Sequence, residues 1–201
     1  MKYLSLLIVA VLYSNTHSQQ IEVRPPALEE LPSVLELDKK VTEEFFQPLY
    51  EAVYQHLGIE RDVKEDLQKE LTMDAESFAQ LVTPKGSERL HIAWDTENNI
   101  PCGLIAFSQH ENNDVSLDLL LVDKKYRQKG IGKKLVHSIF QIFTDTRALI
   151  VCPFQFNNES TLKFYESLGF KNLGLAPVDK TNCHGIRYSD LYYYYRLDVG
   201  S

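Results

Sequence analysis

The sequence predicts a single α/β domain built on a mixed sheet with helices on both sides. Apolar residues recur at helical spacing in the first part of the chain, and the period changes to that of strands in the middle. Helix-like and strand-like segments then alternate, which is typical of layered α/β folds. The chain has 201 residues, 44% of them hydrophobic, and no internal repeat or Gly/Ser linker. Residues 19–201 are therefore expected to form one domain.

The first half of the chain predicts a strand, two helical regions and three further strands. Residues 21–24 alternate apolar and polar side chains before two prolines, which suits a short strand. Helical spacing runs from 28 to 57, where Pro48 is expected to kink or divide the helix, and another helix is expected from 64 to 82. An antiparallel meander should follow, with strands at 89–94, 103–107 and 115–122.

The second half predicts two helices and three strands. The helix that begins near residue 131 has one apolar face, formed by Ile131, Leu135, Ile139 and Phe143. A buried strand is expected at 148–153, and a last helix at 158–168, where Gly169 should end it. The final strands are expected at 170–178 and 186–199. The predicted order is β-α-α-β-β-β-α-β-α-β-β.

Residues 1–18 read as a secretory signal peptide. Lys2 supplies the charged start, residues 3–13 form an apolar run, and Thr16 and Ser18 are small residues before a cleavage site ahead of Gln19. The run is shorter than the roughly 20 apolar residues of a membrane-spanning helix, so no stable membrane anchor is expected. The protein is expected to be secreted or exported, or cytoplasmic if this segment is not a functional signal.

Charge and cysteine content narrow the classes of partner. A net charge of -7 argues against nucleic acid and leans toward a cationic partner. Cys102, Cys152 and Cys183 leave the disulfide status open, although the first two lie in apolar segments where buried free thiols are expected. The histidines lack the spacing of a zinc site, so no metal is expected. Ordinary exposed helix charges are expected at Lys39, Lys40, Glu29, Glu30, Glu43 and Glu44.

A cluster of six cations and two glycines lies where a buried strand is expected to lead into a helix. The cations are Lys124, Lys125, Arg127, Lys129, Lys133 and Lys134. The free amides and positive dipole end of a helix attract anions, and glycine lets amides approach phosphate oxygens. A multiply phosphorylated ligand is predicted. A nucleotide-binding fold is a poor third possibility, because a P-loop needs Ser or Thr where Lys134 follows Gly132-Lys133, and the Gly-x-Gly-x-x-Gly of a Rossmann loop is absent.

A second motif lies downstream, where residues 158–170 read Asn-Glu-Ser-Thr-Leu-Lys-Phe-Tyr-Glu-Ser-Leu-Gly-Phe. Together with Arg127-x-x-Gly130-x-Gly132, this motif resembles the GNAT superfamily of N-acetyltransferases, and the predicted element order is similar to that family's over residues 21–199. The resemblance implies an acetyl-CoA-dependent acyltransferase. It would move the acetyl group to a primary amine by direct attack in a ternary complex, with an acceptor that stays unidentified.

The resemblance also implies roles for individual residues. Leu121 and Val122 would offer backbone groups to the pantetheine arm, and Asn158 would hold the cosubstrate from the other side. Tyr165 would act as general acid toward the leaving thiolate, since a phenol of pKa about 10 suits a thiol of about 8.5. The residues alone also allow Tyr165 as a core aromatic and Asn158 as a helix cap. The diphosphate would be bound by the Arg127 side chain and by the amides of Gln128, Lys129, Gly130, Ile131, Gly132 and Lys133.

The general base is left open by the sequence. Members of the superfamily often carry a glutamate on the strand before the glycine loop, near Asp114 or Ser116, and none is present here. Asp118 is a charge among apolar residues, so it should face the acceptor cleft or have a partner. Asp118 and Asp114 are the candidate bases, with an ordered water as the alternative. The two-residue period places residues 114, 116, 118, 120 and 122 on one face.

A second hypothesis is a secreted coenzyme A-binding module of the same fold without transferase activity. It follows from the predicted signal, which would export the protein to where acetyl-CoA is scarce, and from the missing glutamate. A monomer or a homodimer is expected in either case.

Overall fold

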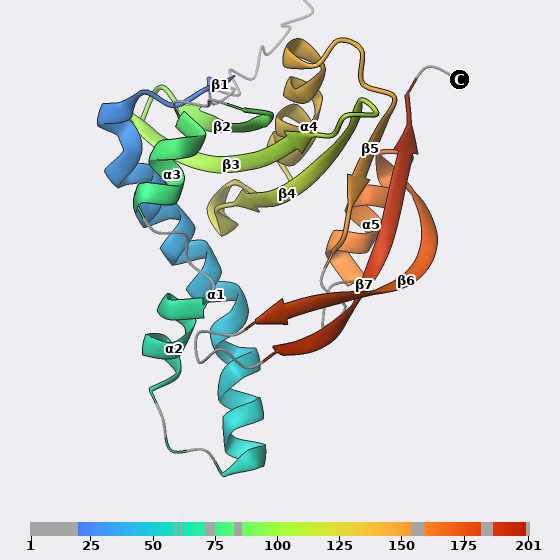
Figure 1. Ribbon diagram of the computed structural model, residues 1–201. Coiled ribbons are helices and arrows are strands. Elements are labelled where there is room, and N and C mark those ends of the chain that lie inside the picture. The colour runs from blue at the N-terminus through green and yellow to red at the C-terminus, as the bar shows by residue number, and fades with distance from the viewer. Residues whose placement is uncertain are drawn as a thin grey trace, which may run out of the picture.

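The protein is built on one mixed β-sheet, shown in a computed structural model that describes residues 20–58, 60, 62–70, 75–82, 86–153, 159–181 and 187–199. The described strands form a seven-stranded sheet in the order β1-β2-β3-β4-β5-β7-β6 (Figure 1). They are β1 (Ile21–Arg24), β2 (Glu88–Asp95), β3 (Ile100–Gln109), β4 (Asp114–Val122), β5 (Ala148–Val151), β6 (Lys171–Thr181) and β7 (Arg187–Asp198). β4 and β5 run parallel, and the other neighbours are antiparallel. The predicted mixed sheet and its meander are confirmed.

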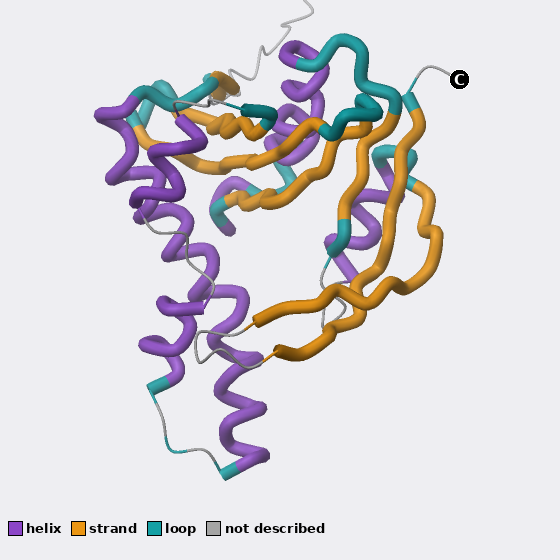
Figure 2. The backbone as a smooth tube through the Cα atoms, in the orientation of Figure 1, coloured by secondary structure: helices purple, strands orange, loops and turns teal. Residues whose placement is uncertain are grey.

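Helices cover both faces of the sheet (Figure 2). They are α1 (Leu31–Leu57), α2 (Val63–Glu70), α3 (Ala75–Val82), α4 (Ile131–Ile142) and α5 (Glu159–Ser167), with short 3₁₀ turns η1 (Leu28–Glu30) and η2 (Lys124–Tyr126). One core lies between the sheet and α1 with α3, and the other lies between the sheet and α4. The apolar stripes of these helices therefore position the strands from both sides.

Three helix predictions can be compared with the structure. The single helix expected at 64–82 is instead two helices, α2 and α3. Pro48 does not divide α1, which continues through it to Leu57. Pro48 is exposed, so water can satisfy the carbonyl that loses its helical donor. The stop at Gly169 is confirmed, because its φ of 92° is in the left-handed region.

β4 contains a bulge that changes which face its side chains occupy. Across the pair with β3, Ala106 faces Leu119 and Phe107 faces Leu117, so Asp118 is the extra residue. Val115, Leu117, Leu120 and Val122 therefore pack toward α4, whereas Leu119 and Leu121 pack toward α1 and α3. The expectation that residues 114 to 122 alternate without interruption was wrong, because a bulge shifts the two-residue period by one.

Several predicted features lie outside the described residues, namely segment 1–18, Asn158 and Cys183. Within the described ranges, no helix combines the length and the apolar character needed to cross a membrane.

Candidate active site

β4 and β5 separate halfway along β4 and leave one strand edge open. Their pairing joins Asp114 through Leu117 to Ala148 through Val151 and goes no further. β4 continues to Val122, so among the described residues its second half has no strand partner on the β5 side. The two strands diverge in Figure 1. An open edge of this kind can pair with an extended ligand through backbone hydrogen bonds.

The open edge leads directly into the cationic turn at the start of α4. Gln128 and Gly130 both have left-handed backbones, with φ of 62° and 77°, and Gly130 caps α4. A Cβ on Gly130 would meet no heavy atom within 4 Å, so the backbone there faces open space. Left-handed residues beside helical ones turn successive amides toward a common point and form an anion-binding concavity. The local geometry fits the predicted diphosphate site.

A buried hydrogen bond anchors this turn to the hairpin between β2 and β3. The Tyr126 hydroxyl donates to Asp95 Oδ2 at 2.7 Å, and Asp95 also accepts from the backbone and side chain of Asn98. Asp95 is fully buried. Burial alone would raise the pKa of Asp95, but the hydrogen bonds from Asn98 and Tyr126 outweigh it and lower the pKa. The turn is therefore held by an ionised carboxylate within the sheet.

Two cations of the turn fold back onto their own segment. Arg127 Nε donates to the Val122 carbonyl at 2.9 Å, and Lys129 Nζ lies 5.1 Å from the centre of the Tyr126 ring. The Val122 carbonyl, one of the groups predicted to contact pantetheine, is thus bound to Arg127. Residues 127–130 are exposed. The charges of this turn therefore lie at the protein surface.

Gly132 brings α5 close to the start of α4. A Cβ on Gly132 would lie 3.1 Å from Cζ of Phe164, which is too close for an undisturbed contact. Glycine therefore allows the first turn of α4 to rest on the Phe164 ring, and Tyr165 follows on α5. Gly103, which the sequence analysis missed, has a similar role, because its Cβ would lie 3.0 Å from the Leu121 carbonyl and 3.2 Å from Leu135. A glycine inside a strand is a signal of such close approach.

Tyr165 is a buried residue surrounded by aromatic rings. It is 4% exposed, and its ring centre lies 5.1 Å from that of Phe164, 5.3 Å from that of Phe170 and 6.5 Å from that of Tyr195. Burial raises the pKa of Tyr165, so its hydroxyl stays protonated at neutral pH. A group in this state donates a hydrogen bond to an anion and resists full proton transfer.

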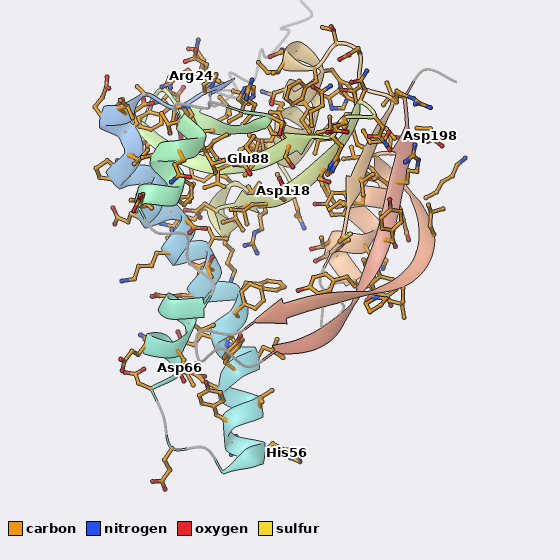
Figure 3. All side chains as sticks on the ribbon, in the orientation of Figure 1. Arg24, His56, Asp66, Glu88, Asp118 and Asp198 are labelled. Carbon is orange, nitrogen blue, oxygen red and sulfur yellow. The ribbon has the colours of Figure 1, made fainter. Side chains whose placement is uncertain are left out.

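Asp118 projects from the β4 bulge on the face of the sheet that α1 and α3 cover elsewhere (Figure 3). Ser108 Oγ donates to Asp118 Oδ2 at 2.9 Å. The carboxylate has solvent-exposed surface, but surrounding protein removes part of its water and raises its pKa, and the charge of Glu88 adds to this effect. The hydrogen bond from Ser108 and, to a smaller extent, the charge of His110 lower the pKa of Asp118, and His110 is hydrogen-bonded to Ser116 at 2.6 Å. A carboxylate of raised pKa at an open site is suited to accept a proton.

Asp114 lies at the other end of β4 and is bound within an ion pair. It is 6% exposed, and Arg196 Nη1 donates to its Oδ2 at 2.9 Å. Asp118 lies four positions further along β4, which corresponds to about 13 Å of strand. The structure thus does not bring the two candidate bases together, and Asp114 joins β4 to β7 through Arg196.

Two further expectations about polar residues were wrong. Cys152 is exposed at the end of β5, whereas Cys102 is buried as expected. Cys152 follows the last paired residue of β5, so no strand among the described residues pairs with it. Glu30 is not an ordinary surface charge, because both of its oxygens bind Arg24, at 2.6 and 2.8 Å. In the described part of the chain, no group of three or more metal-ligating side chains is placed to hold a metal ion.

Comparison with known proteins agrees with this geometry. Residues 86–172 match the model of the acetyltransferase (GNAT) domain. N-alpha-acetyltransferase 30 from Xenopus laevis is 43% identical over 53 residues, which are 26% of this chain and only 19% of that protein. The chain thus matches about a fifth of this relative's length.

Solved acetyltransferase structures share the fold. The PaiA N-acetyltransferase from Thermoplasma acidophilum, solved in complex with coenzyme A, has a TM-score of 0.63 at 16% identity, over 90% of this chain and 99% of the other. The ribosomal-protein-S18-alanine N-acetyltransferase from Escherichia coli has a TM-score of 0.60 at 13% identity, over 90% and 96% of the two chains. Residues 86–172 thus match the GNAT acetyltransferase domain in sequence, and the chain shares its overall fold with these acetyltransferase structures.

Proposed function

We propose that this protein is an N-acetyltransferase that moves the acetyl group of acetyl-CoA to a primary amine by direct attack in a ternary complex. The observation that carries the proposal is the open edge of β4, which leads into a cationic, left-handed turn at the start of α4. The open edge suits the extended pantetheine arm, and the turn suits the diphosphate. The two features follow each other along the chain as the arm and the diphosphate follow each other in coenzyme A. Coenzyme A in the Thermoplasma acidophilum structure supports this assignment.

In this proposal the chain binds the cosubstrate through its backbone and its cations. The amides of residues 128–133 and the Arg127 side chain bind the diphosphate, and Leu121 and Val122 contact the pantetheine arm. Asn158, which lies outside the described residues, is proposed to hold the cosubstrate from the α5 side.

The proposed chemistry uses Asp118 and Tyr165. Asp118 accepts a proton from the acceptor ammonium, and the free amine then attacks the thioester carbonyl. The C–N bond forms as the C–S bond breaks, and the second proton of the nitrogen passes to the departing thiolate, which also accepts a hydrogen bond from the Tyr165 hydroxyl. Asp114 takes no part, because Arg196 holds its carboxylate. The net charge of -7 and the nearby Glu88 favour a cationic acceptor.

A thiol-release assay with a panel of amines tests the proposal. The purified protein is mixed with acetyl-CoA and each amine, and free thiol is followed against mixtures that lack amine or protein. We expect amine-dependent release and an acetylated amine of the matching mass. Coenzyme A binding without release for any amine would instead favour the non-catalytic binding module. N-terminal sequencing of protein from the native host tests export separately, and a mature chain that begins at Gln19 is expected.

A further inference from the structure

An ion pair connects α1 to the segment that precedes the cationic turn. Lys40 Nζ lies 2.6 Å from Asp123 Oδ2, and the side chains are 42% and 9% exposed. Lys40 is exposed on a helix, as expected, but it is not an ordinary surface charge because it pairs with the nearly buried Asp123. Sequence could not reveal the pair, because its residues are 83 positions apart. Lys39, its neighbour on α1, is exposed and is not paired with Asp123.

Asp123 fixes the backbone at the point where the chain leaves β4. Its Oδ1 accepts from the Lys125 amide at 2.9 Å, which caps η2, and its own amide donates to the Cys102 carbonyl at 3.0 Å. Burial alone would raise the pKa of Asp123, but the hydrogen bond and the charge of Lys40 are among the causes that lower it. Asp123 is therefore ionised. Its negative charge lies at the start of the segment whose cations are expected to attract a diphosphate.

We propose that Lys40 is a positioning residue for the cosubstrate, which neutralises Asp123 so that no uncompensated negative charge stands beside the bound diphosphate. The inference rests on the proposed function of the turn. Without Lys40, the nearly buried carboxylate would repel phosphate groups, and little water reaches it to screen this repulsion. The pair also ties α1 to the turn, so the turn keeps its shape before the cosubstrate arrives.

Calorimetric titration of coenzyme A into the full wild-type chain and five variants tests the inference. Lys40→Met should weaken binding about tenfold, which is the size of effect that a charged hydrogen bond carries. Asp123→Asn should stay within about threefold of wild type, because the amide oxygen still caps Lys125 and the repelling charge is gone. Lys40→Met combined with Asp123→Asn should recover most of the lost affinity, and Lys40→Arg should bind like wild type.

The double variant separates neutralisation from simple bracing. If the pair acted only as a brace, Asp123→Asn would bind as weakly as Lys40→Met and the double variant would not recover, and either result would overturn the inference. Lys39→Met removes the same charge from the same helix and should bind like wild type. Melting temperatures identify any variant that fails to fold. If Lys40→Met does not fold, the coenzyme A affinities of Asp123→Asn and Lys40→Arg still test the inference. Wild-type protein that does not bind coenzyme A would refute the proposed function itself, whereas unchanged Lys40→Met refutes only this inference.

Discussion

The two sides of the proposed site are built in different ways. On the cosubstrate side, one continuous segment from Val122 to Lys133 carries the left-handed residues, the cations and the free helix amides. On the acceptor side, Glu88, Ser108 and Asp118 come from three strands and meet only because those strands pair. The difference teaches that a ligand common to a family can be bound by one local segment, whereas the acceptor depends on residues distant in sequence.

Replacing Asp118 should have the largest effect and should separate the two sides. Asp118→Asn removes the proposed base, so kcat should fall by about 10² to 10⁴ while coenzyme A affinity is unchanged. Steady-state kinetics and calorimetry measure the two quantities. Asp114→Asn is the matched control on the same strand, and it should lower the melting temperature through the loss of the Arg196 pair with far less effect on kcat. Equal losses of kcat in both variants would contradict the assignment.

Acid should weaken the core behind the cosubstrate side. His91 is 2% exposed and bound to Ser138 of α4, and burial, followed by the charge of Arg89, lowers its pKa from 6.5 to about 4. Between these two pH values His91 is protonated in the unfolded chain but neutral in the folded chain. The free energy of unfolding therefore decreases as the pH falls. We expect the free energy of unfolding to drop by about 3 kcal/mol between pH 7 and 4 from this residue.

Urea denaturation at a series of pH values measures this loss. His91→Asn should flatten the slope in this range, since asparagine does not titrate. An unchanged slope would show that other groups cause the acid sensitivity.

Enlarging Gly132 should disturb the cosubstrate side alone. Gly132→Val places a branched side chain against Phe164 and should cost about 1 to 3 kcal/mol of stability, with weaker coenzyme A binding as α5 moves away from α4. Thermal unfolding and calorimetry follow both effects. Gly86→Val is the control, because a Cβ there meets nothing within 4 Å. If the two variants behaved alike, close approach at Gly132 would not matter.

Removing the Tyr165 hydroxyl should have the smallest effect. Tyr165→Phe keeps the aromatic packing and should reduce kcat about tenfold, the value of one hydrogen bond to the departing thiolate. Tyr195→Phe removes a neighbouring hydroxyl that donates to Glu166 at 3.0 Å, and it should leave kcat unchanged. Full activity in Tyr165→Phe would mean that this tyrosine serves only the core.

The sequence was a good guide wherever periodicity or a local motif carried the signal. The strands of the meander, the helix after Gly130 and the stop at Gly169 were all predicted, because side-chain period and glycine conformations act over a few residues. The bulge at Asp118 was not predicted, since one extra residue in a pair depends on the partner strand. The exposure of Cys152 was also not predicted. Its segment is as apolar as a buried strand, and the point where strand pairing ends depends on the neighbouring strands.

The amino-acid sequence by itself determined the order of the strands, the cationic glycine turn and the family resemblance, because each depends on residue type and spacing within one segment. Only the tertiary structure decided that Asp114 is bound by Arg196 while Asp118 is open to solvent, and that Lys40 reaches Asp123. These outcomes depend on which distant segments pack together. Packing and strand register assign each carboxylate its charged neighbours, and these neighbours set its chemistry.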